Sequence, residues 1–253
     1  MKIDLSFNAA QFDDLQLRDK TIVVIDVLRA SSTITVALNN GAREIIPVAS
    51  IESAVKISGS LFGEVTLRGG ERNGQMIDGF NLGNSPLEYN ESAVKGKSII
   101  YCTTNGSVAM AKSRYARVLI VGSFLNLSAV VDFLSGENKD FLIICAGRLN
   151  TSGNFSLEDA VCAGMMIQKL MKNESVEVIL SDSAKAAYAL HKSFGRSILK
   201  MLKNSEHGKY LAEIGFVEDL KICAAVDSVP VIPIQIESKI KLRIKEELAV
   251  VSV

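Results

Sequence analysis

The most regular feature of the chain is an alternation between short apolar runs and longer, helix-like segments. The runs are rich in Val and Ile and are mostly apolar at consecutive positions, which is typical of strands covered by helices on both faces. This alternation predicts a layered α/β/α fold with a largely parallel or mixed central sheet. Strands are predicted at 21–26, 43–48, 64–68, 97–102, 117–121, 140–145, 176–180 and 229–236. Helices are predicted at 31–40, 50–59, 85–93, 106–114, 125–135, 157–172, 183–192, 195–203, 205–214 and 217–225.

Two stretches of the chain share the order strand, polar loop, helix and strand. Residues 25–48 end in GAREIIPV and residues 99–122 end in YARVLIVG, at a constant offset of 74 residues. The similarity suggests two weakly repeated βαβα units, although any two such units look alike. No Ser/Gly-rich linker interrupts the chain, so a single domain is expected over residues 1–253. The alternating apolar and polar residues of 229–250 predict a further strand pair or an interface in a homo-oligomer.

Composition and charge narrow the class of protein. Lys and Arg number 28, as do Asp and Glu, so the formal net charge is zero. Nucleic-acid and membrane-surface binders normally carry a basic excess, so neither kind of partner is expected. The chain starts without a signal-peptide pattern and has no run of about 18 apolar residues, which favours a cytoplasmic location. The four cysteines are widely spaced in apolar contexts, as buried reduced thiols are.

Polar residues cluster in four segments that follow predicted strands or fill long loops, where ligands of α/β folds bind. The first is DVLRASST, residues 26–33. Asp26 ends a strand and Arg29 follows, while Ser31 and Ser32 open a helix whose free N–H groups and dipole favour an anion. In the alternative interpretation Asp26 only ends the strand, a serine caps the helix, and Arg29 pairs with Asp26.

The second polar segment is CTTNGSVAM, residues 102–110. It offers hydroxyls, an amide and a flexible glycine with no bulky apolar side chain. A loop of this type can fold into a nest of N–H groups that holds phosphate. A simple helix cap and turn is the alternative. The residues concerned are Thr103, Thr104, Asn105, Gly106 and Ser107.

The third and fourth segments carry most of the candidate carboxylates. Residues 67–89 form a glycine-rich stretch, predicted to be an ordered functional loop, or else a surface excursion. Its candidate ligands are Glu71, Arg72, Asp78, Asn81 and Asn84. In residues 145–164, Ser156 and Asp159 match a helix capping box. Glu158 and Asp159 together would equally suit a hard divalent cation.

These segments, in this order, resemble the 2-phosphosulfolactate phosphatases of coenzyme M biosynthesis. The resemblance implies a magnesium-dependent phosphatase with an α/β fold that hydrolyses a phosphate ester of a small sulfonated or carboxylated hydroxy acid. Asn81 replaces the usual Asp, residues 148–154 form a slightly longer loop, and Lys209-Tyr210 replaces a pair of arginines. The carrying sequences are DVLRASST (26–33), GERNGQMIDGFNLGNSPLEY (70–89), TTNGS (103–107), CAG (145–147) with FSLEDAVCAG (155–164), and SEHGKYL with GFVEDLKICAAVD (within 205–227).

A mechanism follows as an expectation, because phosphoryl transfer depends mainly on positioning and charge neutralisation. Asp26 would bind Mg²⁺ with the help of Glu71 and of Glu158 or Asp159. Phosphate oxygens would be held by Ser31 and Ser32, and by the loop that contains Thr103, Thr104, the catalytic candidate Asn105, Gly106 and Ser107.

Cationic side chains complete the expected site. Arg29 would neutralise transition-state charge, and Arg72 or Arg148 would bind the sulfonate or carboxylate. His207 and Asp227 are weaker candidates: His207 would be an acid for the leaving oxygen or a solvated loop residue. Two alternative functions remain open, a phosphatase for another small phospho-hydroxy acid and a non-catalytic anion-binding homologue.

Overall fold

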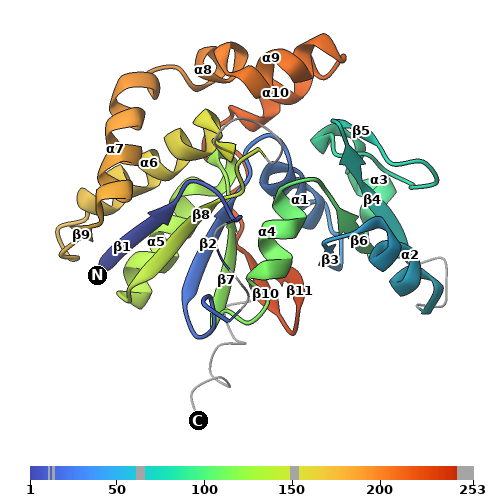
Figure 1. Cartoon of the computed structure of the whole chain (residues 1–253), viewed down its shortest axis with the longest axis horizontal. Helices are drawn as coiled ribbons and strands as arrows, with labels where there is room; N and C mark the ends of the chain where they lie inside the picture. The colour runs from blue at the N-terminus through green and yellow to red at the C-terminus, as the bar shows by residue number, and fades with distance from the viewer. Residues whose placement is uncertain (11, 13–14, 61–65, 149–153, 244–253) are drawn as a thin grey trace.

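The computed structural model describes residues 1–10, 12, 15–60, 66–148 and 154–243. Strands and helices alternate along most of the chain (Figure 1). The strands are β1 (Lys2–Ser6), β2 (Thr21–Ile25), β3 (Glu44–Val48), β4 (Thr66–Arg72), β5 (Gln75–Met76), β6 (Ser98–Cys102), β7 (Val118–Gly122), β8 (Phe141–Cys145), β9 (Ile179–Leu180), β10 (Pro233–Ile236) and β11 (Lys239–Leu242). The helices are α1 (Ala30–Asn39), α2 (Ile51–Ser60), η1 (Pro86–Glu88), α3 (Glu91–Val94), α4 (Gly106–Lys112), η2 (Phe124–Asn126), α5 (Leu127–Glu137), α6 (Leu157–Met171), α7 (Asp182–Phe194), α8 (Ile198–Asn204), α9 (Glu206–Glu213) and α10 (Val217–Cys223).

The strands form one mixed, largely parallel sheet that is not closed into a barrel, in the order β5-β4-β6-β3-β11-β10-β7-β2-β8-β1-β9. Strands β4, β6 and β3 run parallel to one another, as do β7, β2, β8, β1 and β9. The hairpin of β10 and β11 lies between these two blocks and is antiparallel to its neighbours. The two parallel blocks therefore run in opposite directions.

Helices cover both faces of the sheet, as the sequence predicts. The alternating side chains of β2 show the division: Ile22 and Val24 pack with α1 and α4, whereas Val23 and Ile25 pack with α5 and α6. All five residues of β2 are buried, because both faces are covered. Figure 1 shows α1 and α4 between the two blocks of strands.

The two predicted βαβα units correspond to β2-α1-β3-α2 and β6-α4-β7-α5. The second strands of the units begin at Glu44 and Val118, at the offset seen in the sequence. The units also occupy equivalent places in the sheet, because β6-β3 lies on one side of the hairpin and β7-β2 on the other. The helices α1 and α4 are thus equivalent elements of the two units.

Local predictions fail where strand pairing or a cap overrides the sequence pattern. The predicted helix at 85–93 is wrong as a single element, because η1 ends at Glu88 and Asn90 caps the separate α3 by accepting a hydrogen bond from Ala93 N–H. The predicted loop at 67–89 begins as β4, which pairs with β6. Strands β1 and β5 are not predicted from the sequence, and the predicted strands 176–180 and 229–236 shorten to β9 and β10. Part of the predicted strand 64–68 lies outside the described residues.

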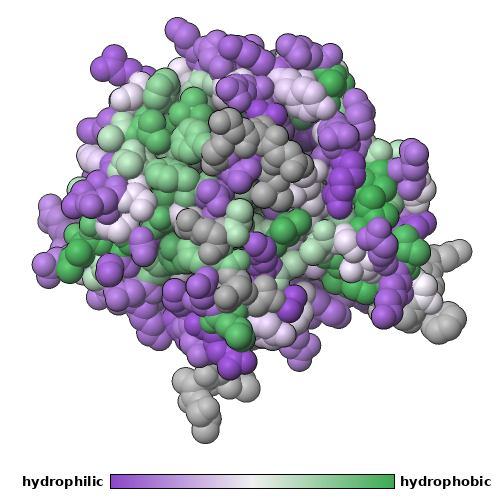
Figure 2. Space-filling model, viewed as in Figure 1, coloured by the Kyte–Doolittle hydropathy of each residue, from purple (hydrophilic) through white to green (hydrophobic). Residues whose placement is uncertain are grey.

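The C-terminal alternation forms a strand pair, β10 and β11, and residues 244–250 of that segment lie outside the described residues. No described helix is long and apolar enough to cross a membrane. Figure 2 shows apolar side chains gathered on two parts of one face, on the left over α6 and α7 and on the right near α2 and β4. A homo-oligomer stays a prediction.

The opposite directions of the two blocks have a consequence for the site. In a flat sheet the loops that follow β2 and β6 would lie at opposite edges and five strand positions apart, about 17 Å along the strands and about 24 Å across them. They meet instead: a Cβ placed on Gly106, after β6, would lie 2.6 Å from Asp26 Oδ2, after β2. The sheet is therefore twisted and curved enough to bring these two ends together.

We expect Gly164→Ala to destabilise the chain by about 1–3 kcal/mol, because a Cβ at this position of α6 would overlap the Ala187 carbonyl of α7. Gly136, near the end of α5, is the matched control, since a Cβ there meets nothing. Gly136→Ala should leave stability unchanged or raise it by up to about 1 kcal/mol. Urea unfolding measures both variants, and equal stability of the two would contradict the close crossing of α6 and α7.

Candidate active site

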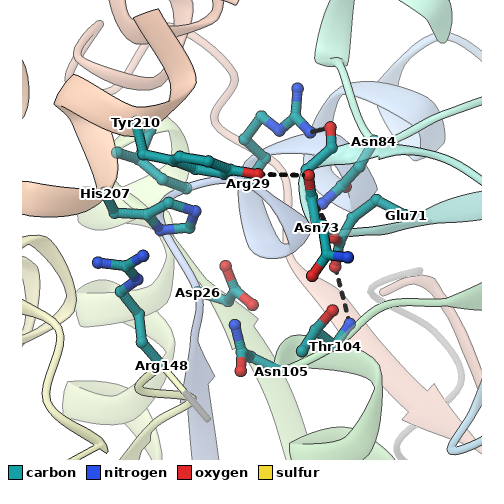
Figure 3. A pocket seen from close by; sticks show the side chains of 12 residues that line it. Asp26, Arg29, Glu71, Asn73, Asn84, Thr104, Asn105, Arg148, His207 and Tyr210 are labelled. Carbon is teal, nitrogen blue, oxygen red and sulfur yellow. Dashed lines mark hydrogen bonds between the residues drawn. The ribbon is translucent and has the colours of Figure 1, made fainter. Parts of the chain in front are cut away.

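A cavity of about 310 Å³ lies where the loops after β2 and β6 meet (Figure 3). The first turns of α1 and α4 reach it, the β4–β5 turn forms another wall, and α9 contributes two side chains. Its lining therefore comes from segments far apart in the sequence. The lining residues are Asp26, Leu28, Arg29, Glu71, Asn73, Gly74, Asn84, Thr104, Asn105, Arg148, His207 and Tyr210.

Asp26 is the buried carboxylate at the centre of this arrangement. Only 6% of the residue is exposed, and its Oδ1 accepts a hydrogen bond from Ala30 N–H at 3.2 Å. Burial raises the pKa of Asp26 from 3.8 to about 6, and the nearby Glu71 and Glu158 add to the rise. His207 and the Ala30 hydrogen bond act in the opposite direction. Asp26 is thus an acid that changes charge near neutral pH inside a cavity.

Glu71 joins the two loops that border the cavity on one side. Its Oε1 accepts from Thr104 N–H at 2.7 Å, and its Oε2 accepts from Gly74 N–H at 2.8 Å. Gly74 has φ +73°, in the left-handed region that favours glycine, and a Cβ there would also lie 2.6 Å from Ile214 Cδ1. Both carboxylate oxygens of Glu71 therefore hold main chain, although the residue also lines the cavity.

Glu158 and Asp159, adjacent at the start of α6, face different partners. Asp159 accepts from Val27 N–H at 2.8 Å and from Gly147 N–H at 3.3 Å. Burial, with the nearby Asp26, raises the pKa of Asp159 well above its usual value. For Glu158 burial acts in the same direction, but His207 at 3.3 Å outweighs it, so the pKa of Glu158 is lowered. One hydrogen bond of the predicted capping box is present: Ser156 Oγ accepts from Asp159 N–H.

Arg29 forms a buried ion pair, but with Asp219 and not with Asp26. Its Nη1 donates to Asp219 Oδ2 at 2.8 Å, and its Nη2 donates to the Gly74 carbonyl at 2.6 Å. The guanidinium also stacks on Phe216, 4.1 Å from the ring centroid. Ser85 donates to the second oxygen of Asp219. The suggested pairing of Arg29 with Asp26 is wrong, and Arg29 is fixed at the cavity wall by partners from α10 and the β4–β5 turn.

The hydroxyl groups predicted to hold phosphate bind the main chain of their own loops. Ser31 Oγ accepts from Asp26 N–H at 2.8 Å, and Ser32 Oγ donates to the Val27 carbonyl. Thr103 and Ser107 exchange hydrogen bonds between side chain and N–H in both directions. All four residues are buried and lie outside the cavity lining. They shape the two loops, and direct contact with phosphate stays a prediction for them, as it does for Thr104, Asn105 and Gly106.

The remaining site residues predicted from the sequence, two arginines and Asp227, differ in whether they line the cavity. Arg148 lines the cavity and pairs with Glu206 at 3.5 Å. Arg72 lies outside the lining, where its guanidinium donates to the Glu71 carbonyl and to Cys102 Sγ. Asp227 also lies outside, where it accepts hydrogen bonds from Ser128 at the start of α5 and from Lys169 in the last turn of α6. Of these residues, Arg148 is the one placed to meet a ligand in the cavity.

Several residues of the site escape sequence reasoning. Asp219 supports Arg29 from α10, and Asn73 and Tyr210 line the cavity, with Tyr210 Oη donating to the Asn73 carbonyl at 2.7 Å. Asn84, by contrast, is a candidate ligand named from the sequence, and it lines the cavity; Tyr101 donates to its side chain, and its carbonyl accepts from Thr33 at 2.8 Å. Asp219 and Tyr210 lie in ordinary helical segments, so only the quoted family sequences around them gave a signal.

The fold and the cavity together define an α/β protein with a small polar site at converging strand ends. The family model described as 2-phosphosulpholactate phosphatase matches residues 8–238. The chain belongs to this family, a family of phosphoric monoester hydrolases.

Curated relatives agree with the family match, and each carries the name probable 2-phosphosulfolactate phosphatase. The protein of Caldanaerobacter subterraneus subsp. tengcongensis is 44% identical over 87% of this chain and 90% of its own length. That of Clostridium perfringens is 43% identical over 88% and 89%. That of Thermotoga maritima is 44% identical over 85% and 88%.

The raised pKa of Asp26 predicts a pH-dependent gain in stability for Asp26→Asn. Between about pH 4 and 6 the folded chain keeps a proton on Asp26 that the unfolded chain has released, so this group's contribution to stability falls as pH rises. The variant should therefore be more stable than wild type by about 3 kcal/mol at pH 8, with the difference shrinking toward pH 4.

Urea unfolding in the presence of a chelator measures this difference, and Asp132→Asn, at an exposed position of α5, is the control. A variant that gains no stability at pH 8, or gains the same amount at every pH, would show that Asp26 ionises normally in the folded chain.

Proposed function

We propose that this chain hydrolyses a phosphate ester of a small sulfonated or carboxylated hydroxy acid, with 2-phosphosulfolactate as the preferred substrate and sulfolactate and phosphate as products. The observation that carries the proposal is the cavity itself. A buried carboxylate, Asp26, lines the cavity together with two guanidinium groups, Arg29 and Arg148, at converging loop ends and helix starts. The family and the names of its relatives supply the substrate.

The size and charge of the cavity support a small anionic substrate. Its volume of about 310 Å³ is at the lower end of the usual range for ligand pockets, roughly 300–1,000 Å³. Within the lining, the positive charges of Arg29 and Arg148 balance the negative charges of Asp26 and Glu71. A phosphate ester with further acidic groups would leave this balance strongly negative, so an additional cation would favour binding.

Magnesium dependence is part of the proposal. The carboxylates near the cavity differ in whether their oxygens are available to bind the ion. Glu71 and Asp159 hold main-chain N–H groups with both oxygens. The described residues contain no preformed cluster of three or more His, Cys, Asp or Glu ligands. For the Asp26 carboxylate, the described residues give one hydrogen bond, from Ala30. Since Mg²⁺ often takes one or two carboxylates, with waters and substrate phosphate oxygens, Asp26 would hold it and the ion would supply positive charge beside the phosphoryl group.

The chain's own residues contribute orientation and charge. Arg29 is fixed by Asp219 and the Gly74 carbonyl, so its direction is set before substrate arrives. As a planar donor it suits the oxygens of a transferring phosphoryl group. Arg148 would meet the sulfonate or carboxylate at the other side of Asp26, where Figure 3 shows it below His207.

The rival proposal of a non-catalytic anion-binding protein rests on Asn81. This residue lies outside the cavity lining, where its Oδ1 accepts from Arg68 N–H at 2.9 Å. A carboxylate at this position would therefore not belong to the lining. Two departures do reach the cavity, Tyr210 and Arg148, the first residue of the longer loop, whereas Lys209 is exposed. The hydroxyl of Tyr210 donates a hydrogen bond to the main chain of Asn73, so this residue supports the cavity wall. Its presence is therefore compatible with the proposed catalysis.

We expect phosphate release to be far faster from 2-phosphosulfolactate than from 2-phospholactate or 3-phosphoglycerate. Asp26→Asn should lower kcat/KM for the preferred ester by more than about tenfold, because it removes the central carboxylate. Asp132→Asn is the matched control, with unchanged activity expected. Equal rates on all esters would assign the protein to another substrate, and binding without turnover of any of them would favour the non-catalytic homologue.

Chelation should abolish phosphate release, and added Mg²⁺ should restore it. A second readout does not depend on turnover: Mg²⁺ with inorganic phosphate should raise the melting temperature of wild type more than that of Asp26→Asn. Activity that survives thorough chelation and does not rise with Mg²⁺ would remove the cation from the proposal.

A further inference from the structure

The segment Ser205–Gly208 places one histidine at the cavity with little freedom. Ser205 Oγ accepts from Gly208 N–H at 3.0 Å and so caps α9. A Cβ on Gly208 would overlap the Leu202 carbonyl of α8, so only glycine allows α9 to start this close to α8. His207, between these two residues, lines the cavity and is 16% exposed.

The ring of His207 has a charged partner on the side away from the cavity. Glu158 Oε1 lies 3.3 Å from His207 Nδ1. Glu158 is 2% exposed and does not line the cavity, and within the described residues no group donates a hydrogen bond to its Oε1. A buried carboxylate oxygen of this kind is costly unless a cation or an N–H group faces it. The contact therefore favours a ring with a proton on Nδ1.

The other ring nitrogen is the one available to a ligand. Nε2 lies across the imidazole ring from Nδ1, and Figure 3 shows the His207 ring between Tyr210 and Arg148, beside Asp26. No hydrogen bond to Nε2 is found within the described residues. A buried carboxylate that faces Nδ1 and leaves Nε2 for chemistry is the arrangement by which proteins set a histidine tautomer.

We propose that His207 is a catalytic acid that protonates the leaving ester oxygen, and that Glu158 is the positioning residue that orients it. The inference rests on the proposed phosphatase function. Water attacks phosphorus, and the bond between phosphorus and the ester oxygen breaks with its electron pair moving to that oxygen. The oxygen takes the proton of His207 Nε2 and leaves as an alcohol. The attacking water supplies both hydrogens of dihydrogen phosphate, and solvent then returns a proton to His207.

This role predicts a dependence on the leaving group that a structural role would not produce. An ester whose alcohol is already acidic needs little help from an acid, whereas an ordinary alcohol needs it fully. The two probes are 2-phospholactate and its 3,3,3-trifluoro analogue, which share the phosphoryl and carboxyl groups but differ in the acidity of the alcohol. His207→Gln should lower kcat/KM for phospholactate by about 100-fold or more, and for the trifluoro analogue by less than about tenfold.

Glu158→Gln should show the same selectivity with a smaller loss, and should add little in the double variant, because its effect passes through His207. Glu213→Gln, an exposed change on α9, is the control. Equal losses on both esters, or no loss, would overturn the assignment of His207. Wild type inactive on both esters and on 2-phosphosulfolactate would instead contradict the proposed function.

The positioning role has a test independent of turnover. The chain has two histidines, His191 and His207, so ¹⁵N spectra of the imidazole groups can be assigned with a His191 variant. At a pH where the His207 ring is neutral, wild type should carry the one ring proton on Nδ1, and Glu158→Gln should mix the two tautomers. The acid form carries a second proton, on Nε2. An unchanged tautomer would overturn the role of Glu158. If Glu158→Gln does not fold, Glu158→Asp gives the same comparison with the charge retained and the contact lengthened.

Discussion

The antiparallel hairpin of β10 and β11 is the element on which the site depends. It separates two parallel blocks and makes them run in opposite directions, with single residue pairs linking it to each side, Ile240 to Ile45 and Ile234 to Ile120. Twist and curvature accumulated over these strands bring the ends of β2 and β6 together. The starts of the equivalent helices α1 and α4 then face each other across Asp26. A site made by the two repeated units is the result.

Four carboxylates gather around this junction, and their partners give them different tasks. Glu71 and Asp159 accept main-chain hydrogen bonds and hold loops, while Glu158 faces His207. Asp26 alone of the four combines a place in the cavity lining with a pKa raised to about 6. Concentrating acids in this way costs stability, because each raises the cost of ionising its neighbours. The cost falls on Asp26, which lines the cavity, and on Asp159, which holds the neighbouring loops. A carboxylate with a raised pKa in a cavity, as at Asp26, is the pattern expected of a functional site.

The sequence pattern predicts the layers and the polar loops, because both depend on local alternation and on residues at strand ends. Asp26, Glu71 and Thr104 are found in this way, since each follows or ends an apolar run. The reversal of strand direction is not predictable locally, because it depends on a pairing between β3 and β11 that lie far apart in the sequence. Asp219 and Tyr210 are missed for the same reason: α9 and α10 look like ordinary helices until they pack over the cavity. Ser31 and Thr103 are the opposite case, because the sequence suggests them as phosphate ligands. In the structure their hydroxyls accept hydrogen bonds from the main chain of their own loops.

The topology joins segments that lie far apart in the sequence. The central hairpin comes from residues 233–242, whereas the strands it joins come from residues 44–48 and 118–122. Such long-range pairing is slow to form, because loop-closure entropy is lost before the contacts are gained. The loops after β2 and β6 belong to the two blocks that this hairpin joins, and His207 and Asp219 come from the helices just before it in the chain. The buried ion pair of Arg29 and Asp219 therefore joins residues 190 positions apart, and the complete lining of the cavity depends on segments from most of the chain.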